Sequence, residues 1–188
     1  MRHRHRKNPT GPLPSLWLMT DERVGAAALL AAAARLPKGR GGIAFRHYRT
    51  DPVARRALFE ALRAVARRRR LVLLLAGSAR EAAAWRADGV HGRDARAAVR
   101  PLLRSRAVHD AREAVAARRA GADLCFVSPL FPTRSHPGAD ALGRVRFAAL
   151  ARQVDMPVMA LGGVRRGHRP MLRAIGADGL AAIDGLSG

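Results

Sequence analysis

The sequence predicts an α/β fold in which eight strand–helix units close into a single (β/α)8 TIM barrel. Short apolar runs alternate with alanine- and arginine-rich stretches of helical spacing, which is the order of repeated βα units. Eight apolar runs can be counted, and the continuous run at Leu71–Ala76 is typical of a parallel strand covered on both faces. With 188 residues the barrel would be small, below the roughly 200 residues at the lower end of the usual range. An open doubly wound sheet is the alternative.

The eight apolar runs are expected as the strands. They lie at Leu16–Met19, Gly42–Tyr48, Leu71–Ala76, Gly89–His91, Ala107–His109, Ala122–Ser128, Val158–Leu161 and Gly179–Ile183. Helical spacing is clearest at Asp21–Arg35, Pro52–Arg67, Ala111–Ala120 and Val145–Gln153. We expect Asp51 and Asp110 to begin helices, and Gly121 and Gly176 to end them. The eighth run lies close to the last residue, so the barrel is expected to lack its final helix.

The arginine content is the most unusual feature of the composition. The formal net charge is +21, and Lys7 and Lys38 are the only lysines. A field of this size attracts polyanions, which keeps nucleic acid open as a partner, but an aromatic content of 4% offers few rings for base stacking. Residues 1–12 are expected to form a disordered basic tail ahead of one barrel domain, 13–188. The arginines at 67–70 are expected at a helix C-terminus, where cations complement the dipole.

Cysteine and hydropathy patterns narrow the class of protein further. Cys125 is the only cysteine, which excludes an internal disulfide. Its neighbours Leu124 and Phe126 are apolar, so we expect a buried, inert thiol. No stretch approaches the roughly 20 apolar residues of a membrane span, and the N-terminus has no apolar segment typical of a secretory signal. The expected location is the cytoplasm, with no membrane partner.

In a barrel of this kind the chemistry collects where strands end and the following loops begin. The most informative such segment is Phe126–Gly138, where an apolar strand runs into a long loop rich in hydroxyls and prolines. The other candidates at strand ends are Arg46, His47, His91, Asp94, His109, Gly162–Gly163 and Asp184–Gly185. Paired glycines let backbone amides face a phosphate, although a tight turn is the alternative explanation. We interpret His91 as a packing residue.

Several segments between residues 87 and 185 follow one another in a recognisable order. They are Ala87–His91, Val108–Asp110 with Glu113 and Ala114, Gly121–Asp123, Pro129–Gly138, Leu142–Gly143, Pro157–Val164 and Gly176–Gly179. In this order they resemble the thiamine phosphate synthase/TenI family. The first half of the chain matches the family more loosely, through Phe45–Arg46.

The resemblance implies a (β/α)8 barrel and an enzyme of thiamine biosynthesis. Synthase members join a hydroxymethylpyrimidine diphosphate to a thiazole phosphate with Mg²⁺ and release pyrophosphate, whereas TenI members include a thiazole tautomerase. The implied residues for substrate or phosphate binding are Arg46, Ser128, Thr133, Ser135, His136, Gly162, Gly163, Asp184 and Gly185. Asp94 is the implied metal carboxylate, with Mg²⁺ as the cofactor if the chain is a synthase.

Departures from the synthase pattern favour the tautomerase. Where the synthases have Gln-x-Arg-x-Lys after the second strand, this chain has Ala44, Arg46 and Tyr48. The Asn-Asp pair after the third strand is replaced by Ala76 and Gly77, which removes a carboxylate that Mg²⁺ prefers.

Two more departures concern the phosphate site. His136 replaces a family lysine and is a weaker cation at neutral pH. Asp184 replaces a phosphate-binding serine, which is unfavourable beside a phosphate unless Arg165 and Arg166 screen the charge.

His109 stands where the tautomerases carry an acid/base histidine. A tautomerisation needs a proton donor and acceptor near neutral pKa and a grip on the phosphate, without a metal. The leading interpretation is therefore a TenI-type, thiazole tautomerase-like enzyme that binds a thiazole phosphate and uses His109 to move protons. Mg-dependent thiamine phosphate synthase is the alternative reaction. A non-catalytic barrel that binds thiamine phosphates or polyanions is the alternative of another class, and a homo-oligomer is left open.

Overall fold

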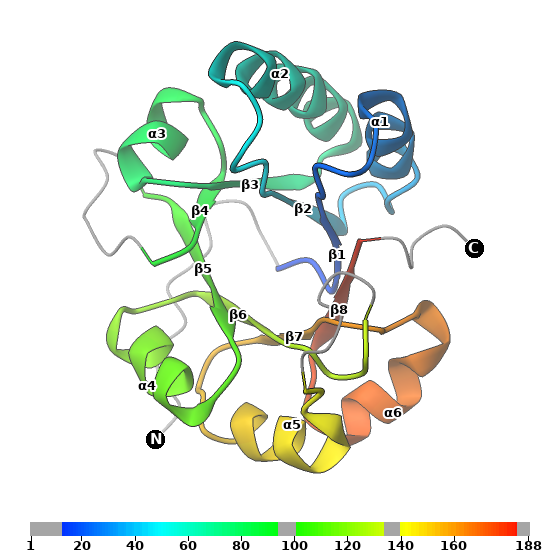
Figure 1. Cartoon of the computed structure of the whole chain (residues 1–188), viewed down its shortest axis with the longest axis vertical. Helices are drawn as coiled ribbons and strands as arrows, with labels where there is room; N and C mark the ends of the chain where they lie inside the picture. Colours follow the sequence, from blue (N-terminus) through cyan, green and yellow to red (C-terminus); the bar gives the residue numbers. More distant parts are fainter. Residues whose placement is uncertain (1–12, 94–100, 134–139, 184–188) are drawn as a thin grey trace.

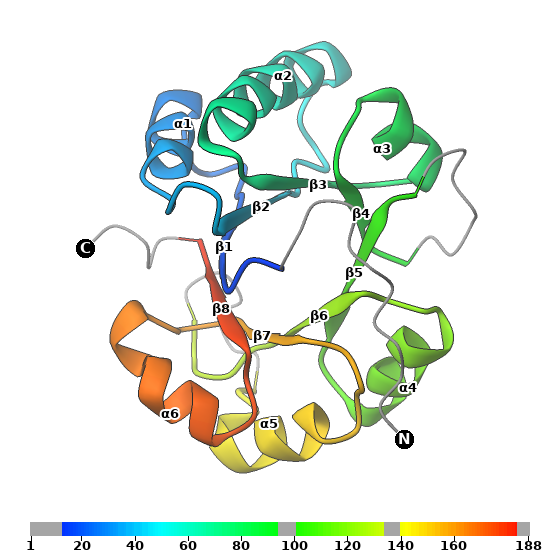
Figure 2. The same ribbon diagram turned by 180° about the vertical axis from the view of Figure 1, so that it is seen from behind.

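The computed structural model describes residues 13–93, 101–133 and 140–183. Eight parallel strands form a closed barrel in which each strand pairs with its neighbours in chain order and β8 pairs with β1. Figure 1 looks down the barrel, and the helices surround the ring of strands on its outside; Figure 2 shows the same arrangement from behind. The predicted (β/α)8 barrel is confirmed, and the open sheet is excluded.

The elements alternate along the chain as predicted. The strands are β1 (Leu16–Met19), β2 (Gly41–Phe45), β3 (Val72–Ala76), β4 (Gly89–His91), β5 (Leu103–Val108), β6 (Leu124–Val127), β7 (Val158–Ala160) and β8 (Gly179–Ala182). The helices of the described residues are α1 (Ala26–Ala34), α2 (Pro52–Arg69), α3 (Ala79–Ala84), α4 (Ala111–Arg119), α5 (Gly143–Ala151) and α6 (Arg169–Ala174), with a 3₁₀ turn η1 (Arg166–His168) ahead of α6. The basic tail at 1–12 and the last five residues lie outside the described residues.

The expected helix ends are confirmed. The Asp51 side chain accepts hydrogen bonds from the amides of Val53 and Ala54, both at 3.0 Å, and so caps α2. Asp110 caps α4 in the same way, through the Glu113 amide at 2.7 Å. Gly121 follows α4 with φ of +64°, a conformation that glycine adopts without strain. The arginines at 67–69 occupy the last turn of α2, where they complement the helix dipole.

Two strand boundaries differ from the prediction. β5 was expected to begin at Ala107 but begins at Leu103, because Arg104 and Arg106 interrupt its apolar pattern while their backbones still pair in the barrel. β2 was expected to run to Tyr48 but ends at Phe45. The other strands differ from the expected bounds by at most two residues at either end.

The helix predictions were less accurate than those for the strands. α1 begins at Ala26 instead of Asp21, because the Asp21 carboxylate folds back onto Arg23, accepting from its amide at 2.9 Å and its Nε at 2.8 Å. α3 and α6 were not predicted; each has only six residues, too few to show helical periodicity. α5 lies two residues earlier than expected.

A small apolar core fills the inside of the barrel. Trp17 is fully buried there and meets Phe126 edge to face, with ring centroids 5.5 Å apart. Gly42, on the neighbouring strand, leaves the space that this ring needs, since a Cβ at that position would overlap it. The larger core lies between the strands and the helices, and it includes Phe59 and Phe147.

Two expectations about burial and membranes can be compared with the fold. Cys125 is buried as expected, and burial raises the pKa of its thiol to about 12. None of the helices within the described ranges is long and apolar enough to cross a bilayer.

Three aspartates fasten β4, β6 and β8 to the strands before them. Asp88, just ahead of β4, donates its amide to the carbonyl of Leu73 and accepts the Leu73 amide on Oδ2, both at 2.8 Å. Asp123 makes the same pair of bonds with Arg104, ahead of β6. Asp178 makes it with Val158, ahead of β8, again with both distances 2.8 Å. Each aspartate therefore clamps one register, and we call these three contacts the aspartate clamps.

Removing one aspartate clamp should cost stability. Asp123→Ala leaves the half-buried Arg104 amide without its acceptor, so we expect a loss of about 1–3 kcal/mol in the free energy of unfolding. Asp155→Ala, at an exposed aspartate, is the matched control and should change it by less than about 0.5 kcal/mol. Urea unfolding measures both. Equal effects of the two substitutions would show that the clamp does not stabilise the barrel.

Candidate active site at the mouth of the barrel

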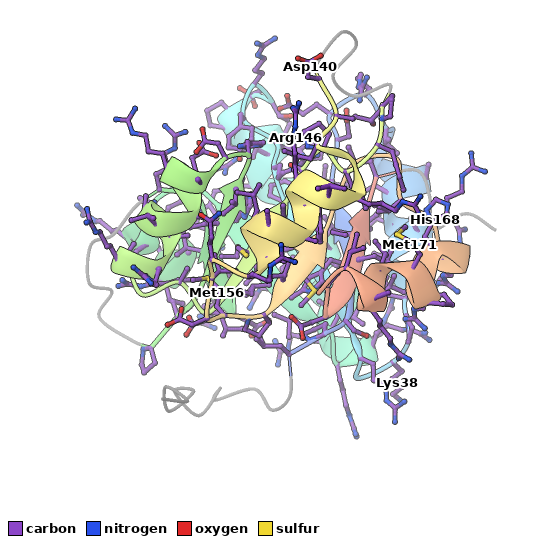
Figure 3. The ribbon with its side chains drawn as sticks, turned by 90° about the horizontal axis from the view of Figure 1, so that it is seen from below. Lys38, Asp140, Arg146, Met156, His168 and Met171 are labelled. Atoms are coloured by element: carbon purple, nitrogen blue, oxygen red, sulfur yellow. The ribbon has the colours of Figure 1, made fainter. Side chains whose placement is uncertain are left out.

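The C-terminal ends of the strands form one rim of the barrel, here called the mouth. Figure 3 views the barrel from the side, with Asp140, which follows β6, at one end and Lys38, which precedes β2, at the other. Side chains alternate along a strand, so residues two positions beyond an inward-facing side chain face inward as well. Ala44 and Phe126 belong to the core inside the barrel. Arg46 and Ser128, two residues further on, therefore point to the mouth.

Arg46 is held in place by Thr20, which follows β1. Its Nε donates to the Thr20 carbonyl at 3.1 Å, and its amide donates to the Thr20 hydroxyl at 2.8 Å. The same hydroxyl lies 3.0 Å from His47 Nδ1. Burial lowers the pKa of the Arg46 guanidinium, but from a value so high that the group stays charged at neutral pH. Arg46 thus holds a fixed positive charge at the mouth, and its role in substrate or phosphate binding stays a prediction.

His91 is a neutral group beneath the mouth. Its Nδ1 lies 2.9 Å from the Ser105 hydroxyl, and its ring meets Phe126 edge to face at 5.5 Å. Burial, and secondarily the charge of Arg46, lowers the pKa of this imidazole to about 4. The packing role expected for His91 is observed, and the side chain also lines the pocket described below.

His109 and Glu113 form a hydrogen-bonded pair at the end of β5. His109 Nδ1 lies 2.6 Å from Glu113 Oε2, and the same oxygen accepts the His109 amide at 2.9 Å. Burial alone would raise the pKa of the Glu113 carboxyl, but the bonds from His109 outweigh it and lower that pKa. Arg93 binds the other oxygen of this carboxylate at 2.8 Å. A carboxylate that contacts Nδ1 restricts the orientation of the imidazole ring.

A pocket of about 700 Å³ opens beside this pair. Its lining residues come from the loop after β2, the segment just after β3, the ends of β4 and β5, and α4. They are Tyr48, Gly77, His91, Gly92, Arg93, Arg106, Ala107, His109, Asp110, Arg112, Glu113 and Ala116. The sequence predicted His91 and His109 here, but not the arginines.

The glycine pair after β7 packs closely against the loop after β6. A Cβ on Gly162 would lie 2.7 Å from the Pro129 Cα, and one on Gly163 would lie 2.8 Å from the Pro132 carbonyl oxygen. Both glycines have positive φ, +90° and +64°. The turn explanation of this pair is therefore correct. It does not exclude ligand binding, since within the described residues neither glycine amide donates a hydrogen bond.

The structure brings together only part of the predicted site. Ser128 is buried at the end of β6, and Thr133 lies further along the loop that Gly163 touches. Five predicted residues lie outside the described residues: Asp94, Ser135, His136, Asp184 and Gly185. Their assigned roles in phosphate or metal binding stay predictions.

Comparison with known proteins identifies the family. Residues 16–186 match the thiamine monophosphate synthase family, TMP-TENI. The chain belongs to this family. It is 35% identical over 187 residues to a thiamine-phosphate synthase of Salinispora arenicola, covering 93% of this chain and 90% of the relative. These names favour the synthase alternative over the tautomerase that the sequence departures suggested.

Two further comparisons concern a longer bifunctional relative and a solved structure. The chain is 28% identical to the thiamine biosynthesis bifunctional protein ThiED of Geobacter sulfurreducens. The match covers 89% of this chain and 36% of the longer protein. A thiamine phosphate pyrophosphorylase from Pyrococcus furiosus superposes with a TM-score of 0.72, covering 90% of this chain and 85% of that one, at 24% identity. At that identity the likeness shows the shared fold.

Sequence reasoning missed Thr20, Arg93 and Arg106. Arg93 and Arg106 belong to the general excess of arginine, so composition hid them. One signal was available: arginine alternates with small or apolar residues at 103–107. Such alternation is typical of a strand with one polar face.

The buried His91 should make stability depend on pH. Its pKa is about 4 in the folded protein and about 6.5 in the unfolded chain, so the unfolded state binds the extra proton between these values. The stability of the wild type should therefore fall by about 3 kcal/mol more than that of His91→Gln as the pH drops from about 7 to about 4. Urea unfolding across this range measures the difference. If the stability of the two proteins changed equally with pH, His91 would not be a buried, neutral group in the folded protein.

Proposed function

We propose that this protein is a thiamine-phosphate synthase-type transferase. The observation that carries the proposal is the family match over nearly the whole barrel, together with synthase-named relatives that align over most of their own length. Its substrates would be small and phosphorylated, a thiazole phosphate and a pyrimidine diphosphate. In the coupling, the thiazole nitrogen forms a bond to the pyrimidine methylene, the methylene–oxygen bond breaks, and its electron pair leaves with pyrophosphate.

The two halves of the mouth support two anion-binding roles. Among the described residues the amides of Gly162 and Gly163 donate no hydrogen bond, and such amides can hold a phosphate monoester, so we assign the thiazole phosphate to this side. Arg46 and the arginine-lined pocket lie on the side of β2 to β5, where we place the pyrimidine diphosphate. The neutral His91 below this pocket can donate or accept a hydrogen bond without adding charge.

A second reaction is favoured by one observation, the His109–Glu113 pair. An imidazole held by a carboxylate is suited to moving a proton between two positions of a substrate, as a thiazole tautomerisation requires. The coupling reaction transfers no proton to or from the substrate carbons that react. The two reactions therefore make different demands on His109.

Turnover distinguishes these functions. We expect the protein to form thiamine phosphate from hydroxymethylpyrimidine diphosphate and thiazole phosphate, measured by fluorescence after oxidation of the product to a thiochrome derivative. Conversion of the thiazole carboxylate phosphate tautomer as the sole substrate, without coupling, would make the tautomerase correct instead. If neither assay shows turnover but thiamine phosphate still binds, the proposal of an enzyme would be contradicted and a non-catalytic binding barrel would be correct.

The His109→Gln variant gives the second test. If the protein is a synthase, kcat for coupling should fall by less than about tenfold, because no proton transfer is lost. If it is a tautomerase, kcat for isomerisation should fall by about 10²- to 10⁴-fold, the usual contribution of a general acid or base. Glu113→Gln, which preserves shape and removes the carboxylate charge, should follow the direction of His109→Gln. A coupling rate that collapses in His109→Gln would contradict the proposed division of roles.

A further inference from the structure

A glutamate of α3 lies at the end of β3, where Gly77 follows the strand. The Glu81 side chain pairs through Oε1 with Arg55 Nη1, from α2. A Cβ built on Gly77 would overlap the other carboxylate oxygen, Oε2. Gly77 lines the pocket of about 700 Å³ at the mouth. The carboxylate of Glu81 therefore occupies the space in which a side chain of residue 77 would begin, beside this pocket.

The synthase pattern places an acidic side chain in this same space. The Asn-Asp pair of that pattern corresponds to Ala76 and Gly77 in this chain, so the aspartate is missing from the strand end. A carboxylate nevertheless reaches the place from the first turn of α3, because Glu81 comes four residues after Gly77 and its side chain extends back to it. The loss of one acidic residue is thus offset by another in space, although not at the same position of the sequence.

Arg55 holds this carboxylate in one orientation. Its Nε donates to the His47 carbonyl at 2.6 Å and its Nη2 to the Ala76 carbonyl at 2.7 Å, and the guanidinium lies 4.8 Å from the centre of the Trp85 ring. The guanidinium fixed by these contacts binds Oε1, whereas Oε2 accepts no hydrogen bond from the described residues. The Glu81 side chain is 31% exposed, so a small ion can reach that oxygen.

One accessible carboxylate oxygen fits the needs of the ion that the resemblance implies for a synthase. Mg²⁺ on a diphosphate takes one or two protein carboxylates, because phosphate oxygens and water complete its octahedron. In keeping with this, the described parts of the chain hold no group of three histidine, cysteine, aspartate or glutamate side chains that could bind a metal ion without a substrate. Among the carboxylates that line the pocket, Glu113 has a partner on each oxygen and Asp110 caps α4.

We infer that Glu81 Oε2 is a ligand of the divalent cation that binds with the diphosphate, in place of the carboxylate missing at residue 77. The inference rests on the proposed function for the presence of a diphosphate and its cation. Such an ion, when bound, offsets the negative charge of the departing pyrophosphate. Arg55 is then a positioning residue, which fixes the carboxylate but, as a neighbouring positive charge, opposes binding of the ion.

Inorganic pyrophosphate is the probe for this inference. Isothermal titration of the full chain in excess MgCl₂ and in excess EDTA gives two apparent dissociation constants, and their ratio measures how much Mg²⁺ tightens binding. Glu81→Gln should reduce this ratio by about tenfold, the effect of losing one charged ligand. In EDTA the same substitution should not weaken binding, because the lost carboxylate repels the anion.

Two further variants separate a ligand from a structural ion pair. Arg55→Gln breaks the same ion pair but keeps the carboxylate and removes a neighbouring positive charge, so the Mg²⁺ effect should stay at the wild-type level or increase. Glu60→Gln is the matched control, since Glu60 is also paired with arginines but belongs to α2 and lies outside the pocket lining. It should change the ratio by less than about twofold.

Three results would overturn the inference. One is pyrophosphate binding that Mg²⁺ does not tighten in the wild type, and a second is an unchanged Mg²⁺ effect in Glu81→Gln. The third is an equal loss of the effect in Arg55→Gln, which would show that only the ion pair matters. If Glu81→Gln does not fold, a crystal of the wild type grown with Mn²⁺ and pyrophosphate tests the same claim. The anomalous signal of Mn²⁺ should lie on Glu81 Oε2, and a signal elsewhere would contradict the assignment.

Failure of this inference differs from failure of the proposed function. Mg²⁺-dependent thiamine phosphate formation that Glu81→Gln leaves unchanged would overturn the assignment of Glu81 and support the synthase. A Mg²⁺ effect on pyrophosphate binding that requires Glu81, without any coupling of the two substrates, would overturn the synthase and support the ion site.

Discussion

Every group at the mouth of this barrel depends on the register of the eight strands, because a shift of one residue would turn each inward-facing side chain outward. The three aspartate clamps fix that register at the opposite end. Each joins the residue before an even-numbered strand to the neighbouring odd-numbered strand through two hydrogen bonds of 2.8 Å. The even strands β4 and β6 then deliver His91 and Ser128 to the mouth. The recurring Ala-Asp pair in the sequence is thus structural, while the chemistry lies at the other end of the same strands.

Two side chains connect this framework to the site. Thr20 holds Arg46 and His47 together at the ends of β1 and β2: its carbonyl accepts from the Arg46 guanidinium, and its hydroxyl contacts the Arg46 amide and the His47 imidazole. Glu113 does the same at the β5 end, where its two oxygens hold His109 and Arg93. Because each oxygen already has a partner, Glu113 is better suited to positioning than to binding a metal ion. The mouth therefore combines fixed cations with imidazoles and has few unengaged carboxylates among its described residues.

The sequence predicted the fold well because eight separate apolar runs can close in only a few ways, and the helix caps at Asp51 and Asp110 have clear local signals. It predicted β5 poorly, because Arg104 and Arg106 interrupt the apolar run. The backbone pairing with β4 and β6 that keeps these residues in the strand cannot be read from the local sequence. For the site, single residues at strand ends such as Arg46 and His109 could be found from position alone. The pocket arginines could not, because an excess of arginine gives no signal about which guanidiniums converge. The ion pair between Arg55 and Glu81 joins two helices, and nothing in the local sequence indicates it.

The losses relative to the synthase pattern look different once the structure is known. Ala76 and Gly77 do not leave an empty place at the end of β3, since Arg55 and Glu81 fill it. These two departures therefore do not exclude a synthase, since a carboxylate, that of Glu81, still lies at this strand end. The local chemistry of this strand end is therefore compatible with membership of the family.

The most direct test of this account is a crystal structure of the full chain with thiamine phosphate and pyrophosphate. The account predicts the phosphate monoester at the amides of Gly162 and Gly163 and the pyrophosphate on the β2-to-β5 side of the mouth, near Arg46. Either group bound elsewhere in the mouth would contradict it.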